Sequence, residues 1–273
     1  MKSALVVDLG LVEYGVAWDL QRRLVAARKA DAIADVLLLC EHPHVITLGR
    51  NGKPTNLLTS GHVLSQMGVS FFETDRGGDI TYHGPGQLVG YPILNLAAIR
   101  RDVGWYVRSL EESMIRATAD LGVPSRRVPG RTGVWVDVLA ASSRNTSPMM
   151  SEEISASVPS AIPPAAPLTA ASDEEKLAAI GVHLSRWVTS HGFAYNVATD
   201  LRYFDLIVPC GIAGKRATSL EKILGARVEM KEVAARITGH LGELLDREFR
   251  LVSVDDLNTV LHTYEHRSAL AAV

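Results

Sequence analysis

Short apolar runs with strand character alternate along the chain with longer segments in which apolar residues recur at helical spacing. The runs that predict strands are residues 4–8, 35–40, 45–48, 71–73, 80–82, 87–96, 133–138, 180–188 and 191–197. The segments that predict helices are residues 14–30, 103–121, 229–245 and 255–267. Strands come in consecutive groups, with helices before, between and after them, rather than in strict alternation. The pattern therefore predicts an α+β fold, with a mixed or mostly antiparallel sheet and flanking helices.

The segment 140–172 differs in composition from the chain around it. Its 33 residues include 8 Ala, 8 Ser and 5 Pro, with no aromatic residue and only three charged ones. Such a stretch buries too little apolar surface to offset the entropy lost on ordering. Because strand patterns resume at Lys176, we expect one domain over residues 1–273, with 140–172 as a mobile insertion within it. A linker between two domains is the alternative.

Composition and charge exclude several classes of protein. Hydrophobic residues make up 47% of the chain and charged residues 21%, which is typical of a globular domain. The 28 Lys and Arg residues against 30 Asp and Glu give a net charge of -2, so no overall basic field favours nucleic acid or an anionic membrane. No apolar run approaches the roughly 18 residues of a membrane span. Asp8 interrupts the first apolar run, where a signal peptide would continue, so we expect a cytoplasmic protein.

The densest group of candidate functional residues is Arg76-Gly-Gly-Asp-Ile-Thr-Tyr-His-Gly-Pro-Gly-Gln87. Glycine lets a backbone come close to a ligand, because no Cβ obstructs the approach. An ordinary turn is the alternative, since Gly-Gly and Gly-Pro-Gly are also common turn sequences. The segment matches neither the phosphate-binding P-loop nor the dinucleotide-binding glycine pattern.

The chain has only two cysteines, which is too few for a disulfide framework. Cys40 ends an apolar strand, where a free cysteine is usually a small core residue. Cys210 follows Pro209 and precedes a glycine, on a turn that could expose its thiol. Thiol reactivity depends on a local environment that a sequence does not show, so on this pattern alone a nucleophilic Cys210 is a hypothesis.

A nucleophilic thiol needs a nearby proton acceptor. Lys176 precedes a small, apolar stretch in which a desolvated lysine could offer a neutral amine, although an ordinary solvated lysine is the alternative. His83, in the glycine-rich segment, is the rival base, and it could equally be structural. His42 and His44 have no cluster of Cys or His around them, so the sequence does not favour a metal site.

Six motifs follow one another over almost the whole chain: Glu41-His-Pro-His-Val-Ile-Thr-Leu-Gly-Arg50, Arg76 to Gln87, Thr132-Gly-Val-Trp-Val136, Lys176-Leu-Ala-Ala-Ile-Gly181, His191-Gly-Phe-Ala-Tyr-Asn196 and Pro209-Cys-Gly-Ile-Ala-Gly214. In this order and spacing they resemble the octanoyltransferase family, also called lipoyl(octanoyl) transferases or lipoate-protein ligase B. The segment 140–172 is the main departure, because most relatives have a short turn there.

The resemblance implies a catalytic domain like those of biotin and lipoate protein ligases, acting as a transferase in lipoate biosynthesis without a cofactor or a metal. Octanoyl would pass from octanoyl-acyl carrier protein to a lysine of the lipoyl domains of 2-oxoacid dehydrogenase E2 subunits or of the glycine cleavage H protein. Cys210 would carry the acyl group as a thioester, and Lys176 would be its partner. The implied substrate-binding residues are Arg76, Gly77, Gly78, Asp79, Ile80, Thr81, Tyr82, His83, Ala179, Ile180, Gly181, Gly192, Phe193 and Ala194.

Three other functions fit parts of the sequence. An ATP-dependent lipoate or biotin ligase would share the fold, but the glycine- and arginine-rich adenylate loop of that class is absent. A noncatalytic module that binds acyl groups or lipoyl domains would leave Cys210 without a chemical role. A cysteine thioesterase would pass the acyl group to water rather than to a lysine.

We expect the protein to be a monomer.

Overall fold

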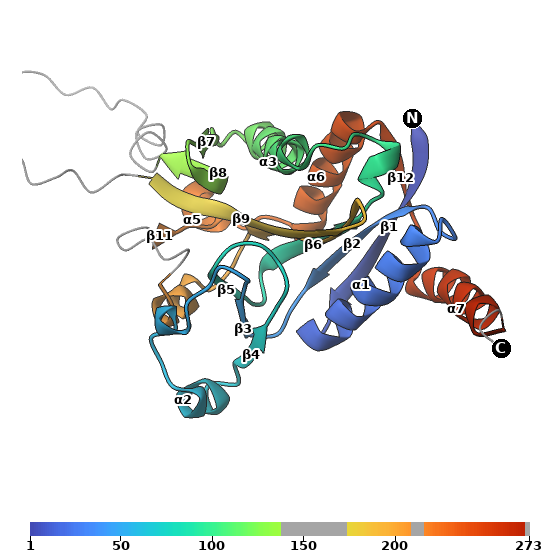
Figure 1. Ribbon diagram of the computed structural model, residues 1–273. Coiled ribbons are helices and arrows are strands. Elements are labelled where there is room, and N and C mark those ends of the chain that lie inside the picture. The colour runs from blue at the N-terminus through green and yellow to red at the C-terminus, as the bar shows by residue number, and fades with distance from the viewer. Residues whose placement is uncertain (138–173, 209–215, 271–273) are drawn as a thin grey trace, which may run out of the picture.

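The computed structural model describes residues 1–137, 174–208 and 216–270, and 140–172 and Cys210 therefore lie outside the described residues. Within them, one mixed sheet of nine strands forms the centre of the molecule (Figure 1). In spatial order its strands are β12 (Arg247–Leu251), β1 (Lys2–Leu11), β2 (Asp35–Glu41), β6 (Gln87–Ile93), β10 (Val188–Asn196), β9 (Glu174–Ser185), β8 (Arg131–Asp137) and β7 (Arg126–Val128), with β11 (Arg216–Ala217) beside β9. From β2 to β7 every neighbouring pair is antiparallel, which confirms the predicted sheet type.

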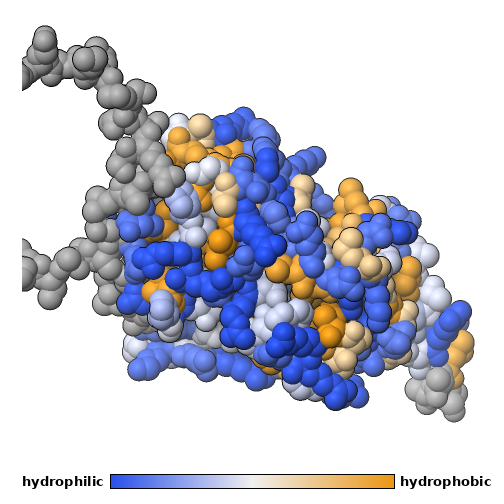
Figure 2. Space-filling view, turned by 90° about the horizontal axis from the view of Figure 1, so that it is seen from above, coloured by the Kyte–Doolittle hydropathy of each residue, from blue (hydrophilic) through white to orange (hydrophobic). Residues whose placement is uncertain are grey.

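Helices cover both faces of this sheet (Figure 1). One face packs against α3 (Val103–Asp120), α5 (Leu220–Leu224) and α6 (Met230–Leu245). In α3, Tyr106, Leu110, Met114 and Ala117 are buried at the three- and four-residue spacing that makes one apolar stripe. The exterior seen from above, over α3 and α6, is mostly hydrophilic with smaller hydrophobic patches (Figure 2). The other face packs against α1 (Tyr14–Lys29) and α7 (Val254–Leu270).

A second, three-stranded sheet lies beside the α1 face, with the order β4 (Ser70–Glu73), β3 (Val45–Leu48) and β5 (Ile80–His83). Its core includes Ile46, Leu64 and Ile80, and Leu64 belongs to the short helix α2 (Gly61–Gln66). Three 3-10 segments complete the described elements: η1 (Pro54–Asn56), η2 (Leu96–Ala98) and η3 (Leu201–Leu206). Pro43 lies in the connection between β2 and β3, which belong to different sheets.

Several predicted strand boundaries are wrong. The run 87–96 continues past β6, which ends at Ile93. The run 180–188 spans a hairpin turn, because β9 ends at Ser185 and β10 begins at Val188. The two turn residues, Arg186 and Trp187, have φ values of 50° and 66°. Asn and Gly usually occupy such left-handed positions, and their absence removed the sequence signal for this turn.

In the described part of the chain, no helix is both long and apolar enough to cross a membrane.

Candidate active site

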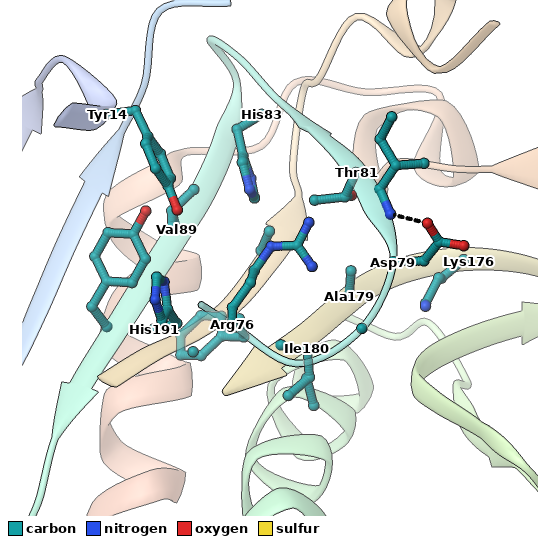
Figure 3. Close-up of a pocket in the computed structure, with 17 residues that line it drawn as sticks. Tyr14, Arg76, Asp79, Thr81, His83, Val89, Lys176, Ala179, Ile180 and His191 are labelled. Atoms are coloured by element: carbon teal, nitrogen blue, oxygen red, sulfur yellow. Dashed lines mark hydrogen bonds between the residues drawn. The ribbon is translucent and has the colours of Figure 1, made fainter. Parts of the chain in front are cut away.

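A pocket lies between the α1 face of the large sheet and the segment 76–83, which curves over it (Figure 3). The residues of the sheet beneath it are small. Ala179 and Gly181 of β9 lie opposite Ala194 and Gly192 of β10. Because these four side chains are short, the sheet and the segment above it leave a space between them.

The structure brings most of the predicted substrate-binding residues together in this pocket, and Lys176 lines it as well. Those that line it are Arg76, Gly78, Asp79, Ile80, Thr81, His83, Ala179, Ile180, Gly181, Gly192, Phe193 and Ala194. Gly77 and Tyr82 do not. Gly77 donates its backbone N–H to the Val182 carbonyl at 2.9 Å, and the Tyr82 ring lies in the core of the small sheet.

The turn 76–79, which leads into β5, is fastened to β3 by the guanidinium of Arg76, a side chain that is almost fully buried. It donates to the Thr47 carbonyl at 2.7 Å, to the Thr47 hydroxyl at 2.9 Å and to the Gly77 carbonyl at 3.0 Å. A Cβ at position 181 would stand 2.7 Å from the Gly77 carbonyl oxygen. Glycine at 181 therefore allows the segment to approach the sheet closely.

His83 is buried at the pocket, where its Nδ1 donates to Gln87 Oε1 at 2.7 Å. The Gln87 amide in turn donates to Asn196 Oδ1 at 2.9 Å. Burial lowers the pKa of His83 to about 3, so its ring is neutral near pH 7. A base this weak is poorly matched to a thiol, and this favours Lys176 over His83 as the proton acceptor.

Lys176 lies at the opposite end of the pocket from Tyr14 and His191 (Figure 3). Its ammonium nitrogen is 5.2 Å from the centroid of the Trp135 ring, which is within the range of a cation–π contact. Nearby, Asp79 accepts from the Asn56 side-chain amide at 2.6 Å and from the Ile80 backbone N–H at 2.6 Å. The pocket thus has an amine at one end and apolar or small residues along its floor.

Four residues that line the pocket were not predicted as site residues: Tyr14, Val89, Tyr91 and His191. The Tyr14 ring stacks near His83, with the ring centroids 6.1 Å apart. His191 is almost fully buried, and its Nδ1 has no hydrogen-bond partner in the part of the chain that the structure describes. Of the four, only His191 stands in one of the sequence motifs, and that was the one available signal.

The other ring nitrogen of His191, Nε2, donates to Asp75 at 2.7 Å. This hydrogen bond lowers the pKa of Asp75 to about 2. Asp75 therefore stabilises the folded state fully above the unfolded-state pKa of about 3.9, and this contribution is lost as the pH falls through about 2. We expect Asp75→Asn to be less stable than the parent at pH 6, with a difference that narrows steadily below about pH 4. Urea unfolding at a series of pH values measures it, and a constant difference down to pH 3 would contradict the assignment.

The other cysteine and histidines considered as candidates, Cys40, His42 and His44, are buried or hydrogen bonded within the fold. Cys40 is buried, and burial raises the pKa of its thiol, as expected of an inert core cysteine. His42 is hydrogen bonded to the Val12 carbonyl at 2.7 Å and to the Tyr91 hydroxyl at 2.6 Å. His44 is 2.7 Å from the Tyr82 hydroxyl. No group of three or more metal-binding side chains is present among residues 1–137, 174–208 and 216–270.

The fold is shared with known lipoate protein ligases. An archaeal bipartite lipoate protein ligase from Thermoplasma acidophilum superposes with a TM-score of 0.66 at 13% identity, covering 97% of this chain and 93% of that one. A lipoate-protein ligase A bound with ATP gives a TM-score of 0.63 at 14% identity, covering 97% and 95%. The family model of the lipoyl protein ligase A/B catalytic domain matches residues 13–242. The fold and the sequence thus define a catalytic domain of this class, as the motifs implied.

Two relatives narrow the class. The octanoyltransferase of Solibacter usitatus is 47% identical over 248 residues, which cover 91% of this chain and 96% of that protein. The octanoyltransferase of Koribacter versatilis is 44% identical over 268 residues, covering 97% and 93%. The chain belongs to the octanoyltransferase family, a family of acyltransferases.

Proposed function

We propose that this chain moves an octanoyl group from the phosphopantetheine thioester of acyl carrier protein to a lysine ε-amine of a lipoyl domain. The acceptors would be the lipoyl domains of 2-oxoacid dehydrogenase E2 subunits and the glycine cleavage H protein. One observation carries the proposal: Lys176 and most of the predicted substrate-binding residues, from three separate segments, line a single pocket. Its floor consists of small residues, Ala179, Gly181, Gly192 and Ala194, which suit contact with an acyl chain.

The first half of the reaction loads Cys210. A neutral Lys176 amine accepts the proton of the Cys210 thiol, and the thiolate attacks the thioester carbonyl of the donor. The new carbon–sulfur bond to Cys210 forms as the bond to the pantetheine sulfur breaks. The Lys176 ammonium returns its proton to the departing pantetheine thiolate. Because one thioester replaces another, the step is nearly isoenergetic and requires no ATP.

The second half transfers the acyl group to the acceptor. The neutral lysine amine of the lipoyl domain attacks the carbonyl carbon of the acyl-enzyme, and an amide bond forms as the bond to the Cys210 sulfur breaks. Lys176 accepts the proton that the attacking nitrogen sheds and can pass it to the Cys210 thiolate. The enzyme returns to its starting state with no cofactor consumed.

We expect the enzyme to act in the cytoplasm. A catalytic thiol that must stay reduced suits the cytoplasm, where disulfides are rare. The family match to residues 13–242 extends on both sides of the segment 140–172, which supports a single catalytic domain with an insertion. We expect the enzyme to act as a monomer.

Intact mass of the protein after exposure to octanoyl-acyl carrier protein tests the covalent intermediate. The parent should gain one octanoyl group, and adding a lipoyl domain should move that group to the domain. Cys210→Ser should form no thioester and should lose transfer by about a thousandfold or more. The matched control is Cys40→Ala, which removes the buried thiol and should still be acylated.

Two outcomes would contradict the proposal. An adduct on Cys210→Ser equal to that on the parent would place the acyl group elsewhere. Octanoylation of the lipoyl domain from free octanoate and ATP, with none from octanoyl-acyl carrier protein, would make the chain an ATP-dependent ligase instead.

A further inference from the structure

Side chains on β9 alternate between the two faces of the large sheet, as in any strand. Ala178 and Ile180 pack against the core beneath α3 and α6, although Ile180 also borders the pocket, whereas Ala179 and Gly181 line the pocket from the opposite face. An unbroken alternation would place Lys176 on the same face as Ala178, inside the core. Lys176 nevertheless lines the pocket.

The pairing of β9 with β8 explains the change of face. Val134 pairs with Ala178 and Trp135 pairs with Lys176, so Leu177 has no partner opposite it on β8. Leu177 is an extra residue, and both it and Ala178 are buried in the same core. Such a bulge inverts the alternation beyond it and can re-aim a side chain beside an active site. We propose that this bulge, together with Gly133 and Trp135 of β8, aims the Lys176 amine into the pocket, an inference that rests on the proposed role of Lys176.

Gly133 provides the path for the lysine stem. A Cβ at position 133 would stand 2.7 Å from Lys176 Cε, 3.4 Å from its Nζ and 2.3 Å from the Ala178 carbonyl oxygen. The φ of Gly133 is 122°, which also disfavours any other residue. The Gly133 backbone N–H donates to the buried carboxylate of Glu111 at 2.9 Å, and Arg127 donates to the same carboxylate at 3.0 Å. Because α3 holds this backbone in place through Glu111, it has little freedom to move away from the lysine.

Trp135 supports the amine itself. Its neighbours Val134 and Val136 face the core beneath α3, so Trp135 faces the same side of the sheet as Lys176, its cross-strand partner. The ring is buried, and its Nε1 donates to the Arg131 carbonyl at 3.2 Å, which fixes its orientation. With the amine 5.2 Å from the ring centroid, the face of the indole favours the ammonium that forms when Lys176 accepts a proton. Gly133 and Trp135 are thus positioning residues that act through Lys176.

Single-turnover acylation of the enzyme by octanoyl-acyl carrier protein, followed by intact mass, tests this inference. We expect Trp135→Leu to slow acylation about tenfold and Gly133→Ala to slow it at least as much. Each variant has a matched control. Trp105→Leu removes a partly buried indole from α3, and Gly130→Ala adds a methyl group at a φ of 74° where nothing lies within 4 Å. Both controls should stay within about twofold of the parent.

The decisive comparison repeats all four substitutions in a Lys176→Met background. If Trp135 and Gly133 act through the lysine, their substitution should change the residual acylation rate by no more than about twofold once the amine is gone. The pH at which the acylation rate rises should also change in Trp135→Leu but not in Trp105→Leu. Urea unfolding identifies any variant that does not fold. If Gly133→Ala does not fold, Trp135→Leu and its control Trp105→Leu decide the result, and the reverse holds if Trp135→Leu does not fold.

Equal slowing in both backgrounds would show that Trp135 and Gly133 act on the fold and not on Lys176. No slowing in either background would show that neither residue contributes to acylation. Either result would overturn the positioning role while leaving the proposed function intact. Full acylation in Lys176→Met itself would overturn both the proposed role of the lysine and this inference.

Discussion

Lys176→Met is expected to slow the acylation of the enzyme by about a hundredfold to ten-thousandfold, the range over which a positioned general base acts. Methionine matches the apolar stem of lysine, from Cβ to Cε, but lacks the amine. The thiol would then have to lose its proton to bulk water. Raising the pH should therefore restore part of the lost rate in the variant, because solvent deprotonates more of the thiol. Single-turnover intact-mass measurements from pH 6 to pH 9 give both results.

Lys222→Met is the matched control for this prediction. Lys222 forms an exposed ion pair with Glu175, which neighbours Lys176 on β9, with the two charged atoms 2.7 Å apart. Such pairs contribute little to stability, so Lys222→Met should acylate within about twofold of the parent rate. A Lys176→Met rate above about a third of the parent rate would show that another group takes the proton. His83 would then be the next candidate, despite its low pKa.

The sequence predicted the elements whose signals are local. The helix that begins at Tyr14 and the strand Val45–Leu48 were placed at their observed starts, because apolar spacing and flanking polar residues mark them. The strand Arg247–Leu251 was missed. Its residues are mostly polar or exposed, since among the described residues it is an edge strand and its one partner is β1, more than two hundred residues away in the chain. Its stability comes from a pairing that a local pattern does not encode.

The pocket shows the same division. The motifs pointed to segments that meet in space, but they did not show which face of a strand each side chain occupies. Lys176 has the parity of a core residue, and only the unpaired Leu177 turns it toward the pocket. Tyr14 and His191 reach the pocket from α1 and β10. His191 begins one of the motifs, whereas Tyr14 carries no local sign of a site. The segments that form the pocket were therefore more predictable than the orientation of the side chains within it.

Arg76→Met is expected to lower the free energy of unfolding by about 2–4 kcal/mol. The buried guanidinium donates to the Thr47 carbonyl, the Thr47 hydroxyl and the Gly77 carbonyl, and methionine would leave these acceptors without those bonds in a place that water hardly reaches. The same bonds hold the turn 76–79 against β3 of the small sheet. We therefore expect the KM for octanoyl-acyl carrier protein to rise as well, because the residues that cover the pocket lose the hydrogen bonds that hold them in place. Urea unfolding and steady-state transfer assays measure the two effects.

The charge of Arg76 is not sufficient for this role, and two variants separate charge from geometry. Arg76→Lys keeps the positive charge, but an ammonium cannot reproduce the planar fork that reaches Thr47 and Gly77 together, so it should recover less than half of the lost stability. Arg50 is exposed, and its backbone N–H donates to the Arg76 carbonyl. Arg50→Met should keep the free energy of unfolding within about 0.5 kcal/mol of the parent value. Full recovery in Arg76→Lys would mean that the positive charge holds the turn 76–79, and the directed hydrogen bonds would then have no separate role in shaping the pocket.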